Sequence, residues 1–369
     1  MDKCLVKTVT LIMLITILSA CEPAAAVVPP TATALSEPTM PLIYVRPTSV
    51  PAISTPIPPA SLEKVIALDL PDSFVNTIIF SRDNHTLITG DLNGEVLVWD
   101  RETWEKTTFL PARSTHAADE AANISYWGTL ALSPDGNVIV QAYGDNGDVT
   151  GRDREGKELF AFSYGARVYS VEISPDGRFL ALGGLDSKIV IFDLKTQQPV
   201  ATLLSDHTFI SNLVFSPDGK MLLANYRRPE HLFTMWDTTS WQAADTFSLG
   251  AGIHVPHDML FSRDGKQLAL ANVLDPEIQF LDLATRQSVK EFHEHSRTSY
   301  QIAFSPDESL LASAGDDFTL RLWDVETSVN FKTIRTIHEA GAVAFSPDGT
   351  LIAFSVWGEG IQVWAVIFN

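Results

Sequence analysis

The sequence predicts an all-β fold in which short antiparallel sheets repeat around a common axis. A turn that opens with Ser and has Asp two residues later recurs seven times, and an apolar strand precedes each copy. The turn serines are Ser81, Ser133, Ser174, Ser216, Ser262, Ser305 and Ser346, at intervals of 41 to 52 residues. A period of about forty residues indicates sheets arranged radially, because one such unit cannot bury both its faces alone.

One copy spans residues 303–324, AFSPDESLLASAGDDFTLRLWD, and its residues predict each strand and turn in order. An apolar strand ends before residues 305–307, which form a type I turn because Ser caps, Pro presets φ and Asp suits the third position. Residues 310–313 make a second, short apolar strand. Residues 315–317 form the next hairpin, and residues 319–323 alternate as a half-buried third strand. The copy is therefore a β-meander.

The repeat resembles the WD-repeat β-propeller. The dipeptide that names this family stands at Trp99-Asp100, Trp236-Asp237 and Trp323-Asp324. In the other copies it is relaxed to Arg152-Asp153, Phe192-Asp193, Leu281-Asp282 and Trp364-Ala365. The resemblance covers residues 61–369 and implies a seven-bladed propeller with four-stranded antiparallel blades.

The first strand of the domain predicts how the ring closes. Residues 64–70 resemble the outermost strand of a copy, such as residues 199–203, yet they precede the first full copy. The last copy reaches its third strand at residues 361–364. We expect residues 64–70 to supply the fourth strand of the last blade, which removes an open edge that would template aggregation.

The resemblance also implies a hydrogen-bonded set of His, Ser or Thr, Asp and Trp in each blade. The sixth copy has the complete set in His295, Ser313, Asp317 and Trp323. Other copies are partial: the first has Thr89, Asn93 and Trp99, the third has Asp186 with Phe192, and the fourth has His207 one residue nearer its turn. A buried polar set of this kind is tolerable when every member is satisfied.

The N-terminal residues 1–20 have the features of an export signal. Two lysines precede an apolar run over residues 9–18, which is short for a bilayer span. Residues 18–21, Leu-Ser-Ala-Cys, resemble the bacterial lipobox, which implies cleavage before Cys21 and lipidation of its thiol. The alternatives are an ordinary secretory peptide or an uncleaved anchor. We expect a lipid anchor on Cys21 at the outer side of a bacterial membrane.

Residues 21–60 are predicted to be a disordered tether that begins with the lipidated cysteine. The segment is rich in Pro and Thr and has almost no charge, so extended polyproline-like conformations are favoured. At about 3 Å per residue it could hold the domain up to roughly 100 Å from the membrane. Because Cys4 and Cys21 are the two cysteines of the sequence, the mature domain, residues 61–369, has no thiol.

The net charge and the absence of catalytic motifs exclude several classes of function. The formal net charge is −19, and no basic run compensates for it, so nucleic acid and anionic lipid surfaces are poor partners for the domain. Four histidines could meet as metal ligands: His254, His257, His293 and His295. The simpler interpretation is that His295 belongs to the structural polar set and that the other three lie in connecting loops. No nucleophile elbow, phosphate loop or zinc-protease motif occurs. We expect a monomer without catalysis, metal or cofactor.

The candidate binding surface lies in the loops that join consecutive copies and in those between second and third strands. In WD-repeat propellers these loops open on one face, and exposed aromatic and Arg residues often supply binding energy. The candidate residues are His116, Tyr126, Trp127, Arg227, Arg228, His231, Trp357 and Glu359. The sequence thus favours a scaffold that binds a protein partner. A binding protein for a small ligand, peptide or glycan is the alternative, followed by an exported propeller enzyme.

Overall fold

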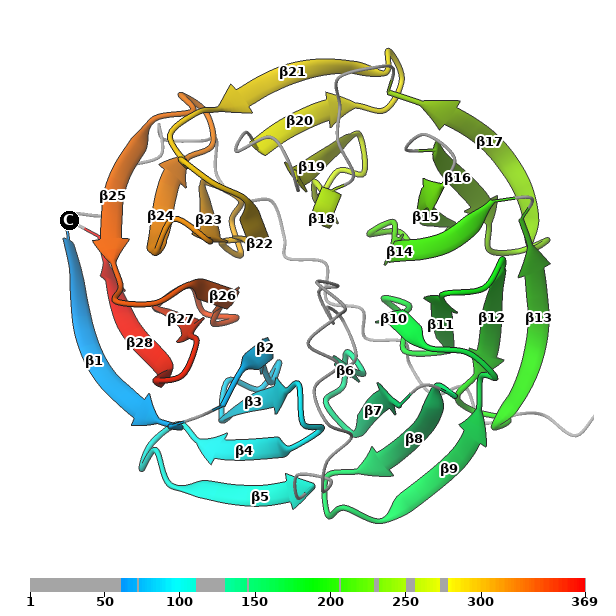
Figure 1. The fold of residues 1–369 in the computed structure, drawn as a ribbon, viewed down its shortest axis with the longest axis horizontal. Coiled ribbons are helices and arrows are strands. Elements are labelled where there is room, and N and C mark those ends of the chain that lie inside the picture. Colours follow the sequence, from blue (N-terminus) through cyan, green and yellow to red (C-terminus); the bar gives the residue numbers. More distant parts are fainter. Residues whose placement is uncertain are drawn as a thin grey trace, which may run out of the picture. The chain divides into compact units, whose positions relative to one another are not determined.

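The protein forms a seven-bladed β-propeller, as the sequence predicts. The computed structural model describes residues 61–71, 73–110, 130–144, 146–205, 207–228, 232–249, 256–272 and 278–368. These residues contain 28 strands in seven four-stranded antiparallel sheets, which stand as blades around a central axis (Figure 1). Within the same ranges no helix is long and apolar enough to cross a membrane.

The first four blades follow the chain, each from its inner to its outer strand. Blade 1 has β2 (Val75–Phe80), β3 (Thr86–Asp91), β4 (Val96–Asp100) and β5 (Lys106–Leu110). Blade 2 has β6 (Leu130–Leu132), β7 (Val138–Tyr143), β8 (Asp148–Asp153) and β9 (Glu158–Ser163). Blade 3 has β10 (Val168–Ile173), β11 (Phe179–Gly184), β12 (Lys188–Asp193) and β13 (Gln198–Leu204). Blade 4 has β14 (Thr208–Phe215), β15 (Met221–Arg228), β16 (Leu232–Asp237) and β17 (Gln242–Ser248).

The remaining blades include the one that joins the two ends of the ring. Blade 5 has β18 (Pro256–Phe261), β19 (Gln267–Asn272), β20 (Ile278–Asp282) and β21 (Gln287–Phe292). Blade 6 has β22 (Ser299–Phe304), β23 (Leu310–Gly315), β24 (Thr319–Asp324) and β25 (Asn330–Arg335). Blade 7 has β26 (Ala340–Phe345), β27 (Leu351–Val356), β28 (Gly360–Ile367) and β1 (Ser61–Asp69).

The N-terminal strand closes the ring, which confirms the predicted closure. β1 pairs antiparallel with β28 from Ser61 opposite Ile367 to Asp69 opposite Gly360 (Figure 1). The strand begins three residues before the predicted start. Leu62 and Leu68 are buried on opposite sides of blade 7 because a register shift between Lys64 and Ile66 changes the face that each residue presents.

The hydrophobic core lies between the blades. Among the described residues seven buried clusters occur, and each joins two neighbouring blades. Between blades 5 and 6, Phe292 packs edge-on against Trp323, and both side chains are fully buried. Each blade therefore buries one face against the blade before it and one against the blade after it, as expected of a repeat that cannot be stable alone.

The recurrent serine fixes the turn between the first and second strand of each blade. In the seven turns the Ser hydroxyl donates to the Asp two residues later at 2.5 to 2.7 Å. In blade 6, Ser305 Oγ also accepts from the Leu310 N–H at 3.0 Å. Glu308 has a left-handed φ of 59°, and five other copies have Gly there with φ of 69 to 74°. Left-handed backbone favours glycine, which explains the common Ser-Pro-Asp-Gly sequence.

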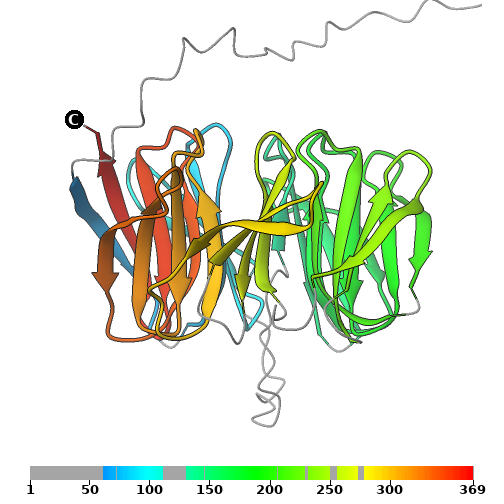
Figure 2. The same ribbon diagram turned by 90° about the horizontal axis from the view of Figure 1, so that it is seen from above.

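The two faces of the ring carry different loops. We call the face with the Ser-Pro-Asp turns the turn face, and the face with the blade-to-blade connections and the turns between second and third strands the connection face. β28 ends on the turn face, at the top of Figure 2, so the connection face is at the bottom of that view. β1 begins on the turn face, because Ser61 pairs with Ile367.

Polar side chains four residues before the turn serine link consecutive inner strands. The Leu213 N–H donates to Ser170 Oγ at 2.9 Å, Asn212 Nδ2 to Pro256 O at 3.0 Å, the Ile302 N–H to Asp258 Oδ2 at 3.0 Å, and the Val343 N–H to Gln301 Oε1 at 2.8 Å. These bonds satisfy backbone groups that no neighbouring strand pairs on the axial side. We call this series the axial ladder.

Candidate functional site

Six inner strands present one bulged residue each near the connection face. Six of the seven inner strands, β6 excepted, have a register shift around the residue five positions before the turn serine. These residues are Asn76, Tyr169, Ser211, His257, Tyr300 and Gly341. A β-bulge re-aims the side chain that it carries. Three of the re-aimed side chains, in blades 3, 5 and 6, are aromatic.

Four aromatic side chains on the connection face form a continuous chain of contacts, which we call the aromatic arc. Phe74 meets Trp357 edge-on, with ring centroids 5.7 Å apart. Trp357 stacks on Tyr300 at 5.4 Å with an interplanar angle of 15°, and Tyr300 meets His257 edge-on at 5.3 Å. The arc joins blades 1, 7, 6 and 5, and Phe74 is 43% exposed. Exposed aromatic side chains are typical anchors of protein interfaces.

A second aromatic contact lies on blades 3 and 4. Tyr169 packs against Phe209 at 4.6 Å, and the Arg227 guanidinium lies over the Phe209 ring at 5.3 Å. Burial and the positive charge of Arg227 lower the pKa of His257 to about 4. His257 is therefore a neutral aromatic group at neutral pH. The second contact ends on blade 4, which packs against blade 5, where the aromatic arc ends.

Two carboxylates lie beside the aromatic arc. The Tyr300 hydroxyl donates to Glu339 Oε2 at 3.5 Å, and Asp316 lies close enough for its charge to act on Glu339. Burial and the Asp316 charge raise the pKa of Glu339 to about 7. Arg297 Nη1 lies 3.6 Å from Asp316 Oδ1, and 61% of the arginine side chain is exposed. We call Asp316 and Glu339 the acidic pair.

Exposed apolar residues occur in three pairs on the same face. In each pair one residue lies in or next to a blade-to-blade connection and the other in a turn between second and third strands. The pairs are Phe74 with Leu92, Leu185 with Leu204, and Phe318 with Ile337. The Leu92 N–H donates to Phe74 O and the Thr336 N–H to Phe318 O, so two of the pairs are held together by backbone bonds. Ile337 is 71% and Leu204 75% exposed.

The predicted binding residues divide into two groups. Arg227 and Trp357 lie in the two aromatic contacts, and Glu359 follows Trp357 in the turn before β28. The backbone of Arg228 ends β15, opposite Thr208. The other predicted positions, His116, Tyr126, Trp127, His231 and the lipidation residue Cys21, lie outside the described residues.

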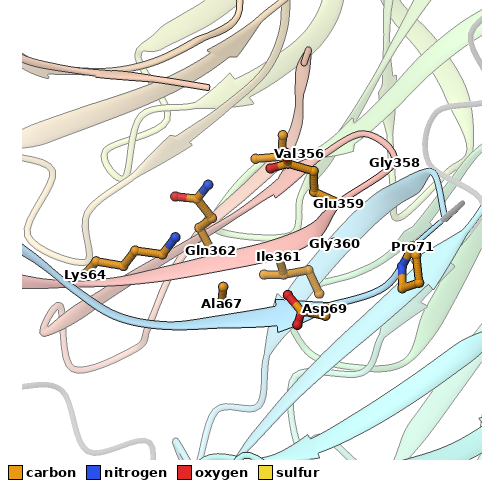
Figure 3. Close-up of a pocket in the computed structure, with 10 residues that line it drawn as sticks. All are labelled: Lys64, Ala67, Asp69, Pro71, Val356, Gly358, Glu359, Gly360, Ile361 and Gln362. Carbon is orange, nitrogen blue, oxygen red and sulfur yellow. The ribbon is translucent and has the colours of Figure 1, made fainter. Parts of the chain in front are cut away.

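A cavity of about 510 Å³ lies on the outer part of blade 7. Its lining comes from β1, the turn before β28 and β28 itself, with Lys64 at one end and Pro71 at the other (Figure 3). Glu359 and Asp69 bring negative charge to the end nearer the connection face. The lining residues come from the last blade and the connection out of β1, so the cavity lies beside the ring-closing pair of strands.

The structure brings the four residues of the predicted polar set together in blade 6. The rings of His295 and Trp323 are buried; His295 Nδ1 lies 3.0 Å from Asp317 Oδ1, and His295 Nε2 lies 2.7 Å from Ser313 Oγ. Trp323 Nε1 donates to the same hydroxyl at 2.8 Å. Partners that include the His295 imidazole hold the pKa of Asp317 well below its usual range.

Blade 3 has a tyrosine at the position that His295 occupies in blade 6. Tyr164 stands ten residues before its turn serine, as His295 does, and its hydroxyl donates to Asp186. Asp186 was predicted from the sequence, whereas its partner Tyr164 was not. Aligning the copies on the turn serine would have found Tyr164, because it has the same offset as His295.

The other histidines occupy separate environments. His257 packs in the aromatic arc, His293 Nε2 lies 3.4 Å from Glu291 Oε2, and His254 is outside the described residues. Across the described ranges no group of three or more His, Cys, Asp or Glu side chains could hold a metal ion.

Tyr300, Phe74 and the acidic pair are not among the residues predicted from the sequence, which indicated His257 only as a possible metal ligand. Tyr169, His257 and Tyr300 share one offset, five residues before the turn serine, so aligning the copies on that serine would have found them. Glu339 and Asp316 have no such signal, because acidic residues are common in exposed turns throughout this sequence.

Comparison with known families identifies the repeat. The WD40 model, described as WD domain, G-beta repeat, matches residues 64–100, 156–193 and 286–324. The chain contains WD40 repeats. Each matched segment begins in the outer strand of one blade or in the turn just before it and ends in the third strand of the next, so a WD40 repeat spans two neighbouring blades. The first segment includes the closing strand β1.

Several curated proteins are similar over much of the chain. Protein FIZZY-RELATED 3 of Arabidopsis thaliana is 22% identical over 74% of this chain and 55% of its own length. Serine-threonine kinase receptor-associated protein of Gallus gallus is 25% identical over 57% of this chain and 58% of its own length. Guanine nucleotide-binding protein subunit beta of Solanum tuberosum is 26% identical over 63% of each chain. The chain thus spans less than two thirds of the length of these relatives.

Proposed function

We propose that this chain is a lipid-anchored, extracytoplasmic WD-repeat scaffold that binds a protein partner through its connection face and has no catalytic activity of its own. The aromatic arc is the observation that carries the proposal. It places four aromatic side chains from four blades in contact at one end of the ring. Rigid aromatic groups on a scaffold of this kind bind partners with little loss of conformational entropy.

The relatives support a role in protein association. The names of two relatives describe one as a subunit of a guanine nucleotide-binding protein and the other as a protein associated with a serine-threonine kinase receptor. The three exposed apolar pairs on the connection face add surface of the kind that partners cover. We infer a comparable role in association for this chain.

The position of the first strand agrees with anchoring through the N-terminus. Ser61, where β1 begins, lies on the turn face. A tether that runs from a lipid on Cys21 to Ser61 would join the domain on the side opposite the aromatic arc. The connection face would then be open to a partner at the outer side of the membrane.

Cross-linking in intact cells tests the proposed binding face. The full chain serves as bait beside two variants, Phe74→Ala/Trp357→Ala on the connection face and Val329→Ala on the turn face, where Val329 is also exposed. We expect mass spectrometry to identify a protein that the wild type and Val329→Ala recover and the double variant loses. Equal recovery by all three folded proteins would refute binding at this face.

A further inference from the structure

We propose that the connection face at blades 6 and 7 recognises a protein segment in which an Arg or Lys side chain stands next to an apolar residue. The inference rests on the proposed function and specifies the chemistry of the partner. Three independent features of this sector carry it: the acidic pair, the stacked rings of Tyr300 and Trp357, and the exposed pair of Phe318 and Ile337.

The charges of the sector favour a cation. Asp316 and Glu339 lie close enough for their charges to interact, and the one basic side chain within ion-pair distance of them in the described residues is the exposed Arg297. Two carboxylates in contact repel each other unless a proton or a cation lies between them. An incoming Arg or Lys would replace the proton on Glu339. The formal net charge of −19 would also attract a basic partner.

The aromatic platform adjoins the acidic pair directly. The Trp357 backbone N–H donates to the Glu339 backbone carbonyl at 3.0 Å, and the Tyr300 hydroxyl donates to the Glu339 carboxylate. The hydroxyl bond holds the Tyr300 ring beside the negative charge, and the Trp357 ring stacks on it. A cation over an aromatic face gains on the order of 1 kcal/mol at an exposed site, and a planar guanidinium can also stack on the ring.

The apolar pair defines the second part of the ligand. Phe318 is 41% exposed and has a left-handed φ of 60°, a conformation that is unfavourable for a bulky residue. Phe318 directly follows Asp317 in the turn that begins with Asp316, and Ile337 lies two residues before Glu339. An exposed ring held in strained backbone is expected where the ring has a binding role. A segment that places its cation on the acidic pair would therefore bring a neighbouring apolar side chain onto Phe318 and Ile337.

Peptide binding tests the proposal without a known partner. The probes are two pools of fluorescein-labelled, capped heptapeptides with Leu, Ile or Phe at the flanking positions. One pool has Arg at the centre and the other has citrulline, which keeps the shape and removes the charge. Fluorescence anisotropy with the full chain should show that the Arg pool binds at least about tenfold more tightly.

Matched variants assign the binding to this sector. Asp316→Asn/Glu339→Gln should weaken the Arg pool about tenfold and leave the citrulline pool unchanged. The control Glu102→Gln/Glu155→Gln removes two exposed charges on the turn face and should change neither affinity.

Phe318→Gly should weaken the binding of both pools without lowering the melting temperature of the protein, because glycine relieves the left-handed strain. Affinity for the Arg pool should rise from pH 6 to pH 8, as Glu339 beside Asp316, Tyr300 and Arg297 loses its proton.

The outcomes separate this inference from the proposed function. Equal affinity for the two pools, no binding of either, or full binding by Asp316→Asn/Glu339→Gln would overturn recognition of a cation. A wild-type dimer in sedimentation that this variant abolishes would assign the surface to a second copy of the chain and would also overturn it. In each case the cross-linking result with Phe74→Ala/Trp357→Ala stands on its own.

Discussion

At the residue scale, one hydroxyl organises the polar set of blade 6. Ser313 Oγ meets both His295 Nε2 and Trp323 Nε1, and all three groups are buried. In blade 1 the equivalent Thr89 accepts from Trp99 Nε1 at 3.1 Å, and the sequence has no histidine at the matching position. The two blades therefore differ in how many buried partners depend on one side chain.

We predict that Ser313→Ala lowers the free energy of unfolding by about 2–4 kcal/mol, because it leaves two buried polar groups without their shared partner. Thr89→Ala should cost about 1–2 kcal/mol, since it affects one indole N–H. Urea denaturation of both variants measures the difference. A cost for Ser313→Ala no larger than that of Thr89→Ala would show that the imidazole contributes nothing through this hydroxyl.

At the element scale, the inner strands contain the hydrogen bonds of the axial ladder and also a carboxylate, Glu172, that is unfavourable when it is ionised. Glu172 lies in β10, and the charge of Asp258 in β18 acts on it. Burial, and then the charge of Asp258, raise the pKa of Glu172 to about 8, and burial raises that of Asp258 to about 6. The folded state therefore keeps protons on these groups at pH values where the unfolded chain has lost them.

The stability of the propeller should consequently fall as pH rises from about 4.5 to about 8. Over this range Glu172 and Asp258 bind more protons in the folded protein than in the unfolded chain, and together they outweigh His257, whose lowered pKa acts in the opposite direction. The free energy of unfolding therefore decreases with pH. Glu172→Gln should remove about 2 kcal/mol of this decrease, because water near the axis screens part of the effect. Urea titrations at pH 5 and pH 8 measure it, with Glu155→Gln on the exposed turn as control. A wild-type stability that rises over this range would contradict the prediction.

The elements differ in how far the sequence determines them. The turn serine bonds to an Asp two residues away and to backbone five residues away, so its spacing predicts the blades and their number. Closure was also predictable, because β1 resembles the outer strands. The aromatic arc was not predicted, since Phe74 and Trp357 meet only after the ring closes. Tyr300 needs a β-bulge to reach Trp357, and the sequence pattern does not show which residue bulges.

At the scale of the whole molecule, the ring depends on one pair of strands that joins its two ends. β1 covers the edge of β28 and buries Leu62 and Leu68 in two different inter-blade clusters. The WD40 match at residues 64–100 begins in this strand, so the first repeat already spans the closure. Loss of the strand should thus open blade 7 and weaken both of its neighbours.

We predict that a chain beginning at Pro71 melts about 10 °C below a chain beginning at Ser61, because it loses three buried leucines and eight paired residues. The exposed edge of β28 should also cause association. Differential scanning calorimetry and size-exclusion chromatography compare the two chains, which both lack residues 1–60. Equal melting temperatures would mean that the closing strand adds no stability.

Membrane anchoring is a property of the whole molecule. The sequence predicts it at Cys21, which lies outside the described residues. If the thiol of Cys21 is lipidated, Cys21→Ala should move the protein from the membrane fraction to the soluble fraction of exporting bacterial cells. Binding of the cross-linked partner in detergent extracts should not change, because the aromatic arc lies on the face opposite the start of β1. Fractionation and detergent phase partition measure the first effect, with Cys4→Ala as the matched control. Membrane retention of Cys21→Ala would show that another segment holds the protein there. Loss of partner binding in the extract would instead show that the anchor takes part in recognition.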